Sequence, residues 1–167
     1  NLESFAKYAE AGVNVGMGTD TFPSDMIQEM RLAAFMAKSQ EHTTYRTRAK
    51  DIFNAATING AKALGRPDLG RLCEGAAADF SVVDLSTIEM TPSRDVIKSI
   101  VYSGTRHSIS RVYVEGQCIV RDGKVGGIDE KGLCEELQAI GEEAWKELRT
   151  KDGRVMDEFY PMSFPRL

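Results

Sequence analysis

One carboxylate, Asp20, stands where the chain is predicted to leave a buried strand. The stretch before it, Gly12-Val13-Asn14-Val15-Gly16-Met17-Gly18-Thr19, places apolar residues at positions 13, 15 and 17 among glycines. This pattern predicts a short buried strand over 13–17. Gly16 and Gly18 add no side-chain bulk, so a ligand or metal could approach the backbone closely. Because the carboxyl ends of strands carry the chemistry in barrel and open α/β folds, Asp20 is a candidate functional residue.

Two other interpretations of the same stretch need weighing. A Gly-Thr-Asp sequence after a strand is often only a turn, in which the aspartate caps the next helix, and the local pattern does not separate this from a catalytic role. A dinucleotide-binding loop is the second alternative. It fits poorly, because Thr21 occupies the position of the third glycine.

Length, charge and cysteine content limit the class of protein. The 167 residues, 42% of them hydrophobic, suffice for one domain or for pieces of two. A net charge of -4 with acidic and basic residues intermixed argues against a nucleic-acid partner, and no apolar run is long enough to suggest a membrane partner. Three cysteines without a CxxC pair favour a reducing, cytoplasmic setting with buried free thiols.

Helices are predicted on both sides of the Asp20 stretch. They cover residues 1–11, 25 to about 39, and about 45–64, the last with an interruption at 57–60. Asp25 is expected to cap the second helix, with Gln28 three residues further on. His42 falls in the polar connection after that helix, where a solvated side chain is expected.

Strands are predicted after residue 69. They cover 80–85 and a hairpin formed by 110–114 and 117–120, joined by a two-residue turn, Glu115-Gly116. Asp122-Gly123 predicts a further turn, and His107 lies in a polar loop before the hairpin. An apolar stripe at 133, 137, 140, 144 and 148 predicts a last helix from about 130 to 148. The tail from 151 to 167, rich in aromatic residues and proline, is expected to lie extended across a surface.

Several of these stretches, taken in order, resemble one protein family. They are Gly16-Met17-Gly18-Thr19-Asp20, Gln28-Glu29-Met30-Arg31-Leu32-Ala33-Ala34, Ala56-Thr57-Ile58-Asn59-Gly60-Ala61-Lys62-Ala63-Leu64-Gly65, Leu69-Gly70-Arg71-Leu72-Cys73-Glu74-Gly75-Ala76-Ala77-Ala78-Asp79-Phe80, Val112-Tyr113-Val114-Glu115-Gly116-Gln117 and Asp122-Gly123-Lys124. Together they resemble the C-terminal part of the amidohydrolase superfamily, in its cytosine deaminase, chlorohydrolase and S-adenosylhomocysteine deaminase branch. Each motif alone is weak, but the ordered set is specific over residues 1 to about 125.

The resemblance implies an α/β fold followed by β structure. Members of the superfamily have a (β/α)8 TIM barrel flanked by a β-sandwich built from both chain ends. By resemblance, residues 1–68 correspond to the last barrel strand and its closing helices. Residues 69–125 correspond to the C-terminal share of the sandwich, and residues 126–167 to a terminal helix and tail.

The resemblance also implies a role for Asp20. It matches the family's aspartate after the eighth strand, which ligates or faces one divalent metal, zinc or iron. That aspartate takes a proton from the metal-bound water and passes it to the leaving group. Such a metal lowers the pKa of bound water toward ~7, and a nearby carboxylate can relay one proton. Thr21 and Phe22 follow on the same loop and are candidate substrate-binding residues, with simple loop packing as the alternative.

The sequence departs from the family at the other metal ligands. The family has a His-x-His pair on the first strand and single histidines on middle strands, and nothing here matches them. Because a catalytic zinc needs about three protein ligands, we expect a fragment that binds no metal by itself and is inactive alone. Its exposed apolar helix faces would drive association, so a homo-oligomer is expected.

Three functions compete at this point. The first is a piece of an amidohydrolase that hydrolyses non-peptide C–N or C–Cl bonds of a small heterocyclic or cyclic amidine substrate. The second is a non-catalytic scaffold or assembly domain of the same shape, because a barrel does not fix function. The third is an independent binding module around residues 69–125.

Overall fold

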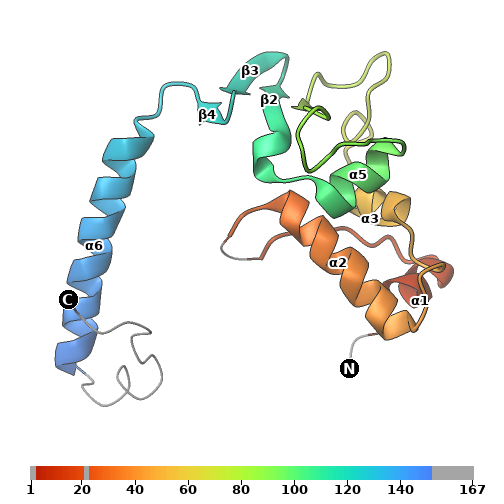
Figure 1. The fold of residues 1–167 in the computed structure, drawn as a ribbon, viewed down its shortest axis with the longest axis horizontal. Helices are drawn as coiled ribbons and strands as arrows, with labels where there is room; N and C mark the ends of the chain where they lie inside the picture. Colours follow the sequence, from red (N-terminus) through yellow and green to blue (C-terminus); the bar gives the residue numbers. More distant parts are fainter. Residues whose placement is uncertain (1–2, 21–22, 152–167) are drawn as a thin grey trace. The chain divides into compact units, whose positions relative to one another are not determined.

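The computed structural model describes residues 3–20 and 23–151, the side chains of 148–151 excepted. It divides into two compact units, residues 1–126 and residues 127–167. The first unit contains the elements coloured from red through green to teal in Figure 1, and the second contains helix α6 (Glu130–Lys151). The first unit's helices are α1 (Phe5–Glu10), α2 (Met26–Glu41), α3 (Ala49–Ala56), α4 (Ile58–Ala63), α5 (Val96–Ser103) and the 3-10 turn η1 (Arg106–Ser108). Its strands are β1 (Phe80–Val83), β2 (Ile109–Val114), β3 (Gln117–Arg121) and β4 (Lys124–Val125).

The core of the first unit lies among α2, α3 and α5. These three helices pack against one another (Figure 1), and Ile52 of α3 and Val101 of α5 are completely buried between them. The other buried members are Met30 and Ala34 on α2, Ala49 on α3, Met90 before α5 and Ile100 on α5. The predicted boundary between residues 68 and 69 lies inside this unit, and its core draws on both sides. A segment beginning at residue 69 would leave α5 without the α2 and α3 side chains that cover it.

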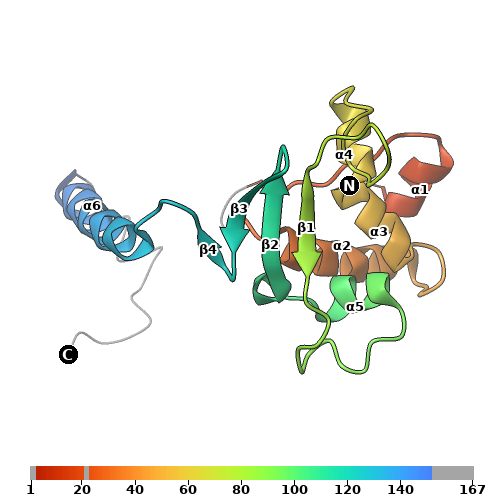
Figure 2. The same cartoon turned by 90° about the horizontal axis from the view of Figure 1, so that it is seen from above.

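The strands form one antiparallel sheet in the order β1-β2-β3-β4, as Figure 2 shows. The predicted hairpin is confirmed. Glu115 and Gly116 have φ angles of 50° and 76°, the left-handed backbone that a two-residue turn between twisted strands requires. Asp122 and Gly123 repeat these angles in the turn before β4.

Glu41, the last residue of α2, fixes the helix that precedes the Asp20 stretch. Its Oε1 accepts a hydrogen bond from the backbone N–H of Ala6 at 3.1 Å, in the first turn of α1. The same carboxylate accepts from the Thr47 N–H at 3.1 Å and from its hydroxyl at 2.5 Å. Because the first N–H groups of a helix have no partner within it, this carboxylate caps α1 and ties it to the start of α3.

The predicted barrel strand over 13–17 is wrong as an assignment. Residues 13–20 are not part of a helix or strand, and among the described residues the strands form only the antiparallel sheet, not a closed barrel. The physical reason is that a strand is defined by its neighbours, and none of the four described strands pairs with this segment. Its polar groups are bonded to helices instead.

Two smaller expectations also need correction. Residues 96–103 form a helix, α5, inside the region predicted to contain strands. The carboxylate of Asp95 accepts from the Lys98 N–H at 3.1 Å, and Ile97, Ile100 and Val101 share one apolar face. The cysteines are free, as expected, but Cys73 and Cys134 are exposed rather than buried. Both lie outside the packed core described above.

The second unit begins with the predicted terminal helix, which is confirmed and extends to Lys151. Within α6, Leu133, Leu137 and Ile140 are each about half exposed. The tail after residue 151, including its aromatic residues, lies outside the described residues. No helix among the described residues has both the length and the apolar content required to cross a bilayer.

Replacing Ile52 by alanine should destabilise the first unit strongly. Removing a fully buried isoleucine side chain leaves a cavity, which typically costs about 2–5 kcal/mol of unfolding free energy. Ile88→Ala is the matched control, because Ile88 is 85% exposed. Urea unfolding followed by circular dichroism should give a lower midpoint for Ile52→Ala and an unchanged one for Ile88→Ala. Equal midpoints for the two variants would contradict the assigned core.

Candidate functional site

The segment that leads to Asp20 is held by the junction between α3 and α4. The Met17 N–H donates to the Ala55 carbonyl at 3.0 Å. The side-chain amide of Asn59 donates to the Val15 carbonyl at 2.9 Å, and that of Asn14 donates to the Asn59 carbonyl at 2.9 Å. Three hydrogen bonds therefore replace the strand ladder that the sequence pattern predicts. They set the path of the chain three residues before the carboxylate.

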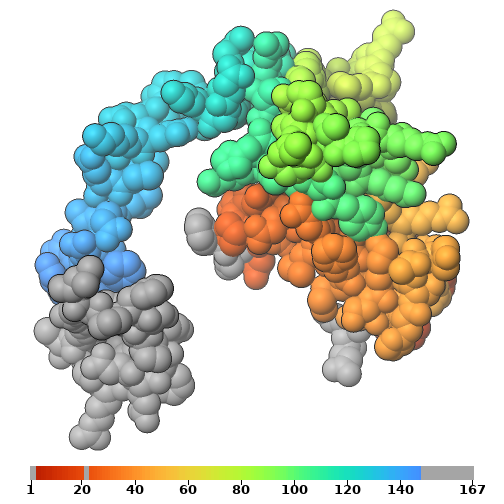
Figure 3. Space-filling view, viewed as in Figure 1, coloured from red at the N-terminus to blue at the C-terminus, as the bar shows by residue number. Residues whose placement is uncertain are grey.

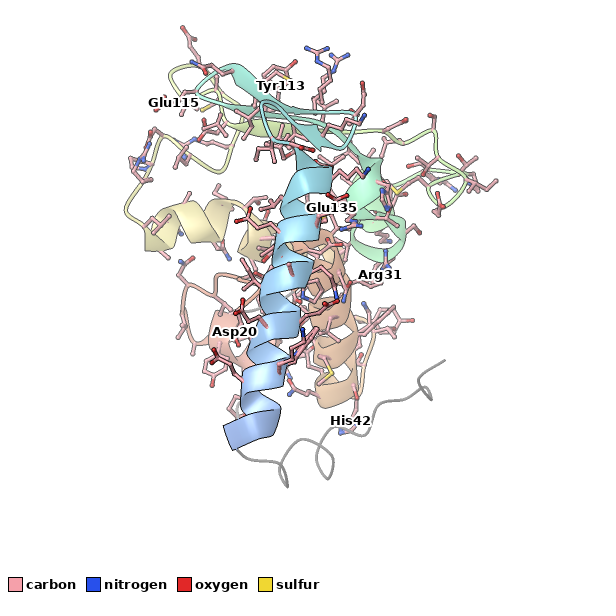
Figure 4. The ribbon with its side chains drawn as sticks, turned by 90° about the vertical axis from the view of Figure 1, so that its left-hand side faces the viewer. Asp20, Arg31, His42, Tyr113, Glu115 and Glu135 are labelled. Atoms are coloured by element: carbon pink, nitrogen blue, oxygen red, sulfur yellow. The ribbon has the colours of Figure 1, made fainter. Side chains whose placement is uncertain are left out.

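Asp20 itself is exposed and has a left-handed backbone, with φ of 59°. Few residues other than glycine adopt this conformation, and aspartate is among those that tolerate it best. The carboxylate has no hydrogen-bond or ion-pair partner among the described residues. In Figure 4 it projects from the segment between α1 and α2. Among the described residues, therefore, no hydrogen bond or ion pair commits the Asp20 side chain to the fold.

The capping alternative for Asp20 is wrong, because Asp25 caps α2. Its Oδ1 accepts from the Ile27 N–H at 3.0 Å and from the Gln28 N–H at 3.1 Å. The prediction for Asp25 is confirmed. Thr21 and Phe22 lie outside the described residues, so their proposed contacts with a substrate stay predictions.

Two other carboxylates of the first unit, those of Asp68 and Asp84, are occupied by structural hydrogen bonds. The Arg66 guanidinium donates to both Asp68 oxygens, at 2.8 and 2.6 Å, and this pairing lowers the pKa of Asp68 to about 2. Hydrogen bonds from the hydroxyl and backbone N–H of Ser86 likewise lower the pKa of Asp84. Carboxylates held in this way are poor proton acceptors near neutral pH. Asp68 and Asp84 are therefore weaker candidates than Asp20.

The described residues do not fit a metal site of their own. No three histidine, cysteine, aspartate or glutamate side chains among them come together. His42 and His107 are exposed, and Figure 4 shows His42 well away from Asp20. A catalytic zinc takes about three protein ligands, so one carboxylate falls short. Any metal would need ligands from outside the described residues.

A hollow of about 370 Å³ lies on another part of the first unit, between α1, α3 and α4. The ion pair of Glu10 and Arg46 lies at its wall, with Asn54 and Asn59 nearby. Asp20 does not line it. The hollow is therefore no substrate pocket for the candidate carboxylate.

The two asparagines that hold the Asp20 segment were not singled out from the sequence. Asn14 is the one polar residue between apolar ones in the predicted strand, and Asn59 falls in the predicted helix interruption. A polar amide inside an apolar strand, together with a second amide at a helix break, is the signal that could have indicated a contact between them.

A comparison with known protein families shows which family this chain belongs to. The model of the amidohydrolase family matches residues 1–119. The chain belongs to the amidohydrolase family. The match includes Asp20, the α3–α4 junction and most of the antiparallel sheet, so the resemblance predicted from the motifs is confirmed.

Curated relatives of this amidohydrolase chain include deaminases of archaea. It is 36% identical over 141 residues to a 5'-deoxyadenosine deaminase from Methanosarcina mazei, covering 82% of this chain and 32% of that protein. It is 40% identical over 121 residues to a 5-methylthioadenosine/S-adenosylhomocysteine deaminase from Thermococcus sibiricus, covering 70% of this chain and 28% of that protein. The chain thus spans roughly a third of the length of these relatives.

Solved structures extend the similarity to zinc-containing enzymes. An adenosine deaminase from Xanthomonas campestris with bound zinc matches 87% of this chain and 33% of its own, with 31% identity and a TM-score of 0.76. An atrazine chlorohydrolase from Arthrobacter aurescens complexed with zinc matches 80% of this chain and 31% of its own, with 29% identity and a TM-score of 0.68. Zinc is therefore present in structures similar to this chain.

By itself the chain should fail to retain zinc. After incubation with zinc chloride and gel filtration, we expect far less than one zinc per chain, because Asp20 supplies one of about three necessary ligands. Metal content would be measured by atomic absorption, with Asp20→Ala as the control. Stoichiometric zinc in the unchanged chain, lost in Asp20→Ala, would contradict the ligand analysis.

Proposed function

We propose that this chain contributes Asp20 to an amidohydrolase that releases ammonia or chloride from a small heterocyclic substrate. The single observation that carries the proposal is the family match across the stretch that ends in Asp20, among relatives named as deaminases and a chlorohydrolase. The exposed carboxylate, free of partners among the described residues, is consistent with a chemical role. The complete activity would also require polypeptide beyond the third of the relatives that this chain spans.

Asp20 would relay a proton during hydrolysis. Water adds to an sp2 carbon of the substrate, and the carboxylate accepts the proton that the water loses. The same proton then passes to the leaving nitrogen, so the C–N bond breaks and ammonia departs. A chloride leaving group departs without that proton, which the carboxylate then releases to water. A carboxylate with no competing hydrogen bond is well suited to accept and return the proton.

The metal in this proposal would be held largely by residues outside this chain. The similar structures contain zinc, while the described residues offer no ligand cluster. We propose one divalent ion in the assembled enzyme, with Asp20 as one of its neighbours. Iron is the alternative ion that the sequence resemblance implies.

Association with further polypeptide would cover apolar side chains that this chain leaves exposed. Leu32, Phe35 and Met36 lie on α2, whose orange surface is visible in Figure 3, and each is about half exposed. Exposed apolar groups of this kind favour contact with another surface. They support the proposal of a homo-oligomer or of packing against the rest of a barrel.

A non-catalytic scaffold remains the competing function. It is favoured by the lack of a metal-ligand cluster in the part of the chain that the structure describes. The adjoining gene sequence separates the two proposals. A His-x-His segment and two further histidines would support the enzyme, and a complete gene without them would support the scaffold.

Replacing Asp20 by asparagine should abolish most of the activity of the protein encoded by the complete gene. Loss of the proton acceptor should lower kcat by about 10² to 10⁴. The assay measures ammonia release from purine nucleosides, and chloride release from a chlorotriazine, with zinc present.

Asp25→Asn provides a matched control for this variant. The same chemical change is made five residues away, and asparagine caps a helix about as well as aspartate. This variant should retain kcat. Full activity of Asp20→Asn would refute the role given to Asp20.

A further inference from the structure

The segment before Asp20 must be held in place without pairing to any described strand. It runs without strand neighbours among the described residues, yet the position of the Asp20 carboxylate depends on its path. Among the described residues, the hydrogen bonds of residues 14–20 come from the point where α3 ends at Ala56 and α4 begins at Ile58. Thr57, with φ of -128° and ψ of -94°, interrupts the helix there. The Val13 N–H donates to the Tyr8 carbonyl of α1, and Met17 packs against the core.

The interruption makes a backbone carbonyl and a side-chain amide at the helix ends available to the segment before Asp20. The last carbonyls of a helix lack partners within it, and the Ala55 carbonyl at the end of α3 accepts the Met17 N–H. Asn59, in the first turn of α4, adds a side-chain donor. An uninterrupted helix through residue 57 would use the Ala55 carbonyl internally and withdraw this acceptor.

Asn14 and Asn59 join the segment before Asp20 to the α3–α4 junction by two hydrogen bonds that run in opposite directions. The Asn59 amide donates to the Val15 carbonyl, and the Asn14 amide donates to the Asn59 carbonyl, both at 2.9 Å. The backbones also approach closely, since a Cβ atom added at Gly16 would lie 3.8 Å from the Gly60 Cα. The contact is therefore specific in both hydrogen bonding and shape.

We propose that Asn14 and Asn59 form an amide clamp that sets the position of Asp20, with Asn59 as its main positioning residue. The clamp fixes residues 14 and 15, and the Met17–Ala55 bond fixes the chain just beyond them. Only Gly18 and Thr19 then separate the fixed part from the carboxylate. The inference rests on the proposed function for its catalytic consequence, but the clamp itself concerns the described residues alone.

Hydrogen exchange on the chain tests the clamp without any assay of activity. In Asn59→Ala, the Met17 amide, which donates to the Ala55 carbonyl, should exchange about fivefold to tenfold faster, since a lost clamp bond raises the population of the locally opened state. Peptides from α2 should be unchanged. Asn14→Ala should show the same effect more weakly, and it provides a second variant if Asn59→Ala fails to fold.

Asn54→Ala is the matched control. Asn54 lies on α3, one turn before the junction, and its side chain has no partner among the described residues. Its replacement removes the same atoms and should leave exchange of the Met17 amide unchanged. Unchanged exchange of the Met17 amide in both clamp variants would overturn the proposal.

Activity of the complete protein provides the second readout. A misplaced catalytic group lowers the rate of the chemical step more than it weakens substrate binding, so Asn59→Ala should lower kcat about tenfold or more with KM nearly unchanged. A rise in KM alone would overturn the positioning role. If the unsubstituted protein shows no hydrolysis while exchange responds as expected, the proposed function fails and the clamp stands.

Discussion

Backbone N–H and C=O groups need hydrogen-bond partners, and the partners of the segment before Asp20 shape this region. In a sheet, neighbouring strands provide those partners. Here a break between two helices provides them, through one main-chain carbonyl and two asparagine amides. The position of the candidate carboxylate thus depends on residues more than thirty positions further along the chain.

Burial of apolar side chains fixes the helices on which that break lies. Ile52 on α3 is buried against α2 and α5, so the end of α3 has a fixed position relative to both. Glu41 then joins the end of α2 to α1, which precedes the Asp20 segment. The segment is therefore anchored before residue 12 by a cap and after residue 13 by the helix break. Among the described residues, helices hold the segment that leads to Asp20.

Local rules allowed much of this chain to be predicted from its sequence. Asp25 as the cap of α2, the break near Thr57, and both two-residue turns depend on residues close in sequence, where side-chain chemistry and backbone conformation are directly linked. The family was also predictable, because several motifs occur in a fixed order. The identity of Asp20 as the candidate carboxylate came from the same source.

Features that depend on residues far apart in the chain were harder to predict from the sequence. Alternation of apolar residues over 13–17 predicts a strand, but whether a strand forms depends on neighbours that the pattern does not contain. The contact between Asn14 and Asn59 spans 45 positions and involves two residues that are individually common in turns. The helical nature of α5 was missed because Asp95 and the apolar spacing after it lie within a region of strands and loops.

The left-handed backbone at position 20 limits how this site can change during evolution. Glycine and asparagine adopt such a conformation readily, whereas β-branched residues strongly resist it. A descendant could therefore exchange the acid for a neutral residue while the main chain keeps its course. Loss of chemistry and preservation of architecture are therefore compatible at this position.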